Sequence, residues 1–69
     1  MSEEIWRLRR GDRIVICELQ NDTGVGLGWD VQLLEGGEVL FSKRCPREDD
    51  ARFAAESFRQ DYVRTGFTE

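Results

Sequence analysis

The sequence contains no histidine, one proline, one lysine and two cysteines among its 69 residues. Without histidine, the usual general base for a serine or cysteine nucleophile is missing. Two cysteines alone do not supply the four ligands of a structural zinc site. No apolar run approaches the ~20 residues that a transmembrane helix requires. These shortages predict a non-enzymatic chain with no catalytic, cofactor-binding or metal-binding residues and no membrane partner.

The length predicts one small domain over residues 1–69. Domains of this size bury only about 60% of their unfolded surface, so a homodimer is a reasonable expectation. The 14 acidic and 10 basic residues give a net charge of −4, which disfavours non-specific binding to nucleic acids or acidic membranes. The acidic start, Met1–Glu4, lacks the apolar segment of a secretion signal, and we therefore expect a cytoplasmic protein with reduced Cys17 and Cys45.

The stretch Gly28–Cys45 has the pattern of a β-hairpin with a glycine-rich turn. A two-residue loop would mix apolar and polar residues on each face. A three-residue loop, Glu35–Gly37, would pair Leu33 with Val39 and separate the two types. We therefore predict the three-residue loop, with a core face made of Trp29, Val31, Leu33, Val39, Phe41 and Cys45.

Alternating apolar and polar residues predict strands at about 4–9, 13–20, 28–34 and 38–44. On the second strand, Val15, Cys17 and Leu19 are assigned to the core face. The segment Asn21–Leu27 is predicted to be a loop. It leads into a strand rather than a helix, so its glycines do not favour a phosphate-binding loop.

Residues 46–65 are predicted to form a helix, with Pro46 at its first position and Cys45 as the N-cap. Gly66 suits the left-handed position after the helix, where Phe67 can pack back on Tyr62 in a Schellman motif. A stripe of small and aromatic residues faces the core: Ala51, Ala54, Ala55, Phe58, Tyr62 and Thr65. The predicted fold is therefore α+β, an antiparallel meander of three to four strands (β-β-β-β-α) with the helix across one face.

The outer face of this sheet carries more apolar residues than a solvated surface needs. Ile14 and Ile16 alternate with the core residues of the second strand, and Leu40 is expected beside them. Phe53 lies opposite the core stripe of the helix. Contiguous apolar patches usually mark interfaces. The leading hypothesis is therefore a small non-catalytic interaction module that self-associates through Ile14, Ile16, Leu40 and Phe53.

An arginine cluster supports an alternative hypothesis, single-stranded nucleic-acid binding. A sheet face that carries arginines beside an aromatic residue can hold a single strand by charge and stacking. The candidate contacts are Arg7, Arg9, Arg10, Arg13 and Arg44.

Several short motifs resemble small bacterial proteins of unknown function. They are Trp6–Arg9, Cys17–Leu19, Gly28–Val31 and Ser42–Cys45, together with the alanine-bearing helix. This resemblance transfers no site. The order of sheet and then helix is also similar, in topology alone, to the arm-binding domain of phage integrases and to Whirly-type and coactivator single-strand-binding domains. That similarity implies the same nucleic-acid alternative.

Overall fold

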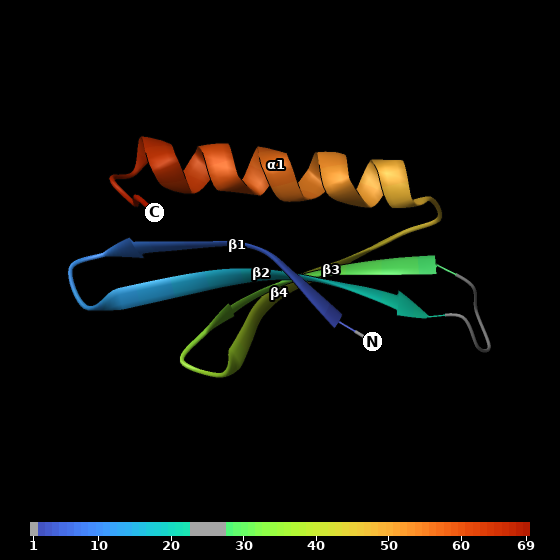
Figure 1. Cartoon of the computed structure of the whole chain (residues 1–69), viewed down its shortest axis with the longest axis horizontal. Helices are drawn as coiled ribbons and strands as arrows, with labels where there is room; N and C mark the ends of the chain where they lie inside the picture. Colours follow the sequence, from blue (N-terminus) through green and yellow to red (C-terminus); the bar gives the residue numbers. More distant parts are fainter. Residues whose placement is uncertain (1, 23–27) are drawn as a thin grey trace.

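The computed structural model describes residues 2–22 and 28–69, which form a four-stranded sheet and one helix. All neighbouring strands are antiparallel, in the order β1-β2-β3-β4, and α1 covers one face of the sheet (Figure 1). This confirms the predicted α+β meander. Residues 23–27 of the predicted glycine-rich loop lie outside the described part. The elements are β1 (Ser2–Arg10), β2 (Arg13–Asp22), β3 (Gly28–Glu35), β4 (Glu38–Cys45) and α1 (Glu48–Arg64).

The core lies between the sheet and α1. Val15, Cys17 and Leu19 of β2 are almost fully buried, as their alternation predicts. Trp29 faces the core but is only partly buried. Trp6 is more deeply buried than Trp29, with 8% of its surface exposed. Buried residues come from every element and from the tail: Trp6, Leu8, Val15, Cys17, Leu19, Val31, Leu33, Cys45, Ala51, Ala54, Ala55 and Phe67.

The predicted three-residue hairpin loop is wrong. Glu35 pairs with Glu38, so only Gly36 and Gly37 form the turn. Both glycines have positive φ, at 60° and 84°, as the two central positions of a type I′ turn require. Glycine adopts this conformation without the steric penalty of a Cβ atom. The turn chemistry therefore prevails over the alternation that favoured the longer loop.

A β-bulge at Leu40 follows this turn. Leu34 pairs with Val39, whereas the next residue, Leu33, pairs with Phe41. The extra residue returns Phe41 to the helix side, where its ring meets the ring of Phe58 edge-to-face at 5.3 Å. Val39 lies on the outer face beside Leu34 and is 54% exposed. Its predicted place in the core is therefore wrong.

α1 begins two residues later than predicted. The N-cap is Arg47, with an extended backbone and no hydrogen bond from its side chain to the first turn. Cys45 is still paired with Trp29 as the last residue of β4 and is buried, so it is not the N-cap. Pro46 and Arg47 form the connection that carries the chain from the sheet layer to the helix layer.

The helix ends in the predicted Schellman motif. The N–H of Phe67 donates to the carbonyl of Tyr62, and the N–H of Gly66 donates to that of Val63. Gly66 has φ 102°, and the rings of Tyr62 and Phe67 meet edge-to-face at 5.1 Å. This turn directs the tail back to the sheet. There, Thr68 exchanges two backbone hydrogen bonds with Arg9, at 2.7 and 2.8 Å.

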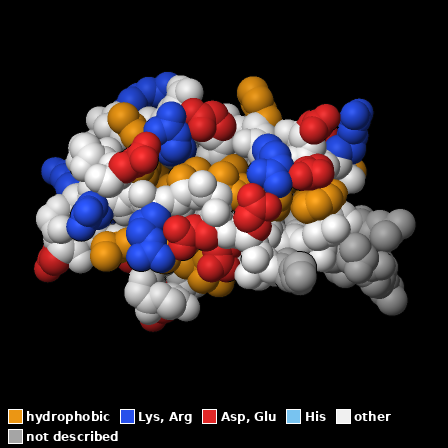
Figure 2. Space-filling view, in the orientation of Figure 1, with side chains coloured by type: hydrophobic (Ala, Val, Ile, Leu, Met, Phe, Trp, Pro, Cys, Tyr) orange, Lys and Arg blue, Asp and Glu red, His pale blue; other side chains and the backbone are white. Residues whose placement is uncertain are grey.

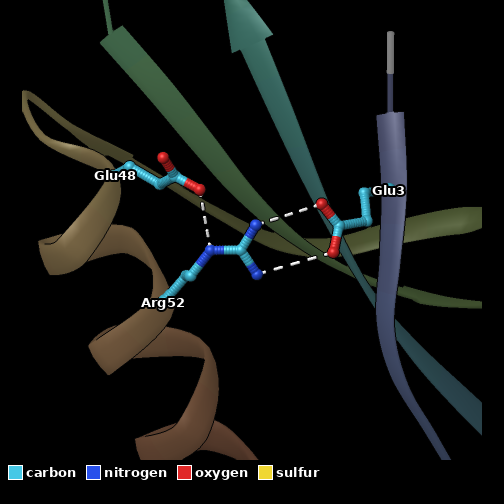
Figure 3. Close-up of polar contacts among 3 residues, drawn as sticks. All are labelled: Glu3, Glu48 and Arg52. Atoms are coloured by element: carbon cyan, nitrogen blue, oxygen red, sulfur yellow. Dashed lines mark hydrogen bonds and ion pairs between the residues drawn. The ribbon is translucent and has the colours of Figure 1, made fainter.

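A charged contact joins the first turns of α1 to the start of β1. Arg52 donates to Glu48 of its own helix and to both carboxylate oxygens of Glu3 (Figure 3). Glu3 reaches the helix because it is paired with the buried Leu19 and therefore faces the same side of the sheet. All three charged side chains are about half exposed, so this contact contributes little to the stability of the fold.

Candidate functional site

The outer face of the sheet is the first candidate surface, because no described element covers it (Figure 1). A cross-strand row of apolar side chains runs over it, from Ile16 of β2 through Leu34 of β3 to Val39 of β4. Ile14 lies two residues from Ile16 on the same face and is 42% exposed. The other half of the face is polar, with Glu18, Gln20, Asp30, Gln32, Ser42 and Arg44.

The structure brings together only part of the predicted self-association set. Ile14 and Ile16 share the outer face, as predicted. Leu40 is the extra residue of the bulge and is 47% exposed at the sheet edge. Phe53 projects from α1, which packs on the opposite side of the sheet, so it does not join the outer-face residues. Sequence reasoning missed Val39, which a two-residue turn would have placed on the outer face.

A groove of about 420 Å³ separates the last strand from the helix. Lys43 forms part of its sheet wall, while Phe53 and Phe58 form part of its helix wall. Phe53 is 75% exposed, the highest fraction among the large apolar residues of the described chain. The end of β4 lines this groove, and the outer edge of β4 is the second candidate surface.

The five predicted nucleic-acid contacts do not form one patch. Arg7 and Arg9 lie on the outer face of β1, since they pair with Ile16 and Ile14. Arg10 and Arg13 lie near the C-terminal tail, where Arg13 stacks over the Phe67 ring. Arg44 lies on β4, at the other edge of the sheet. This arrangement offers the nucleic-acid hypothesis no specific support, and it stays a prediction.

Most basic side chains of the described residues are engaged with carboxylates. Arg7 pairs with Glu4 at 2.9 Å, and Arg13 binds both oxygens of Glu35 at 2.9 Å. Figure 2 shows the result on one side of the molecule, where acidic and basic side chains alternate with apolar atoms between them. Such a surface presents no continuous positive field to a phosphate backbone.

Two carboxyl groups in these contacts have a lowered pKa. The hydrogen bonds from Arg13 hold the pKa of Glu35 below its ordinary value of 4.5, and those from Arg59 and Gln60 do the same for Glu56. A carboxyl whose pKa is lower in the folded state stabilises that state above the unfolded pKa. This contribution is lost as the pH falls through the folded pKa.

We therefore expect the free energy of unfolding to decrease as the pH falls below about 4.5. Urea denaturation over a pH series measures this dependence. Glu35→Gln should flatten the decrease, and Arg13→Gln should flatten it to the same extent, with no further change in the double variant. An undiminished acid dependence in Glu35→Gln would contradict this assignment.

The two cysteines lie in the core rather than at a reactive site. Both are free and buried. Burial raises the pKa of the Cys17 thiol to about 12, which keeps it protonated and unreactive at neutral pH. Among residues 2–22 and 28–69, no three acidic or cysteine side chains cluster as a metal-ligand set. The same residues include no helix with the length and apolarity to cross a bilayer.

The described residues thus form a four-stranded antiparallel sheet that is covered by α1 on one face. The other face and the outer edge of β4 are the two candidate surfaces. Comparison of the chain with protein-family models, with curated proteins and with solved structures finds no match.

Proposed function

We propose that the protein is a non-catalytic interaction module that forms a homodimer by stacking the outer faces of two sheets. The observation that carries the proposal is the apolar row Ile16–Leu34–Val39, with Ile14 beside it, on a face that no described element covers. A group of apolar residues on an uncovered face, with polar residues beside it, is typical of an interface. A second copy offers the same surface, so the contact is self-complementary.

Such a contact would need the whole outer face, which is roughly 500 Å² in projection. Four strands about 4.8 Å apart and about eight residues long cover roughly 20 by 26 Å. A standard interface buries about 800 Å² per partner. That is about one sixth of the 4782 Å² that this chain exposes. For a chain of 8.0 kDa, burying one apolar face adds substantially to a small core.

Substituting Ile16 with glutamate should halve the molar mass of the protein in solution. A carboxylate at position 16, next to Ile14 and Leu34, would be buried without a partner in the stacked pair, at a cost of several kcal/mol. Light scattering coupled to size exclusion, across the micromolar range, measures the mass. Ile14→Glu should act in the same direction and is tolerated by the fold, because Arg9 lies beside it.

Phe53→Glu is the matched control, since Phe53 is exposed on the helix and away from this face. It should leave the mass unchanged, and circular dichroism should show that all three variants are folded. A wild-type protein of 8.0 kDa throughout the range, or an Ile16→Glu variant with unchanged mass, would overturn the proposal.

A further inference from the structure

The outer edge of β4 is a second open surface, independent of the outer face. β4 is the last strand of the sheet, so one side of its backbone has no strand partner within residues 2–22 and 28–69. Seven of its eight residues are exposed. Exposed strand edges are templates for pairing with another strand. The edge therefore has a specific geometric requirement, namely an extended segment that runs along it.

The two ends of β4 carry opposite charges. Glu38 is the first residue of the strand, and Lys43 lies near its C-terminal end. Neither makes an ion pair with any residue in the described ranges. Between them lie three exposed apolar residues, Val39, Leu40 and Phe41. An antiparallel copy of the same strand would bring each acidic end to the basic end of the other.

The bulge places the two charged side chains on the same face of the sheet. Residues five positions apart point to opposite faces of a regular strand. The extra residue at Leu40 removes this difference. Glu38 pairs with Glu35, which pairs with the buried Val15, and Lys43 pairs with the buried Val31. Both charges therefore lie on the helix side of the sheet, where they can meet across a strand pair.

We propose that β4 pairs antiparallel with β4 of a second copy, around a two-fold axis between Leu40 and Phe41. In this register, Glu38 lies opposite Lys43 of the second copy, and Val39 lies opposite Ser42 on the outer side. Leu40 lies opposite Phe41 at the axis. Each pair occurs twice, and backbone hydrogen bonds form in the regular segments on either side of the two bulges. The result is one continuous eight-stranded sheet.

This contact uses the strand edge rather than the outer face; the two surfaces share Val39, but the strand pairing does not depend on the face-to-face dimer. Both contacts are two-fold, so together they build a tetramer when their axes are perpendicular. Ile16→Glu removes only the face contact. A protein that carries this substitution should therefore remain a dimer, held by β4.

A charge exchange tests the strand pairing. In the Ile16→Glu protein, Glu38→Lys and Lys43→Glu should each weaken the remaining dimer about tenfold, because each places two like-charged pairs across the axis. The double exchange, Glu38→Lys with Lys43→Glu, restores both pairs with reversed sign and should return the dissociation constant to within about threefold of its starting value. Sedimentation equilibrium at low salt measures all four constants. Both side chains are exposed, so the fold of each chain should be unaffected.

Hydrogen exchange supplies an independent readout. The amides of β4 should exchange more slowly as the concentration of the Ile16→Glu protein rises, whereas those of β1 should not change. An Ile16→Glu protein that is monomeric, or single exchanges that leave its dissociation constant unchanged, would overturn the strand pairing. In the latter case, the outer-face proposal would still stand on its own test. Rescue by the double exchange would support pairing with a second copy rather than with an unrelated extended peptide.

Discussion

Replacing Trp6 with alanine should lower the free energy of unfolding by about 3–5 kcal/mol, enough to unfold much of a domain of this size. Trp6 is 8% exposed, and its ring packs 6.1 Å from that of Tyr62. Its indole N–H donates to the carbonyl of Ala55, at 2.8 Å. The side chain therefore joins β1 to α1 by both packing and a buried hydrogen bond. Urea denaturation followed by circular dichroism, at fixed protein concentration, measures the loss.

Two further variants separate the contributions of Trp6. Trp6→Phe retains most of the apolar volume but removes the donor, and should cost about 1–2 kcal/mol. Val63→Ala truncates an exposed apolar residue of α1 and should change the stability by no more than about 0.5 kcal/mol. If the free energy of unfolding of Trp6→Ala is within about 1 kcal/mol of that of the wild type, the helix does not depend on this contact.

The second large effect is expected from adding volume under the helix. Ala51 and Ala55 are fully buried, because α1 lies close to the sheet along its alanine stripe. Ala55→Leu forces the two layers apart and should cost about 1–3 kcal/mol. We expect the upper end of this range, because the same movement lengthens the hydrogen bond from Trp6 to the Ala55 carbonyl.

Ser57→Leu is the control for this substitution. Ser57 is exposed and lines the open groove between α1 and β4, so leucine there fills open space without displacing the sheet. The same denaturation measurement should give Ser57→Leu a free energy of unfolding within about 0.5 kcal/mol of that of the wild type. Equal stabilities of Ala55→Leu and the wild type would mean that the helix–sheet spacing adapts freely.

Features that depend on short-range sequence could be predicted. The faces of β2 follow from its alternation, which correctly separates Val15 and Cys17 from Ile14 and Ile16. The end of α1 was also predictable, because Gly66 is required by a positive φ that few other residues adopt. These features are decided by residues within a few positions of one another, and the α+β meander follows from them.

The hairpin register could not be predicted from alternation alone. The two-glycine turn and the bulge at Leu40 each shift the pattern by one residue. Because the two shifts cancel beyond the bulge, Phe41 and Cys45 keep their predicted side while Val39 changes side. The start of α1 was missed for a related reason, since Cys45 remains in the sheet and delays the helix.

The candidate surfaces also divide into features that depend on short-range sequence and features that depend on long-range structure. Ile14 and Ile16 were predictable because one strand displays them. The charge pair of Glu38 and Lys43 was missed, because a regular strand would place these residues on opposite faces. The separation of Arg10 and Arg13 from Arg44 depends on strand order and on the position of the tail, which are both long-range properties.

The short tail after α1 has a consequence for polymerisation. Thr68 occupies backbone groups of Arg9 on the outer edge of β1, so the two edges of the sheet are not equivalent. Pairing between β1 of one molecule and β4 of the next would be head-to-tail and would propagate without limit into a fibre. Pairing between two β4 strands is two-fold and gives a closed dimer at that edge. By covering Arg9, Thr68 thus disfavours head-to-tail pairing at that part of the β1 edge.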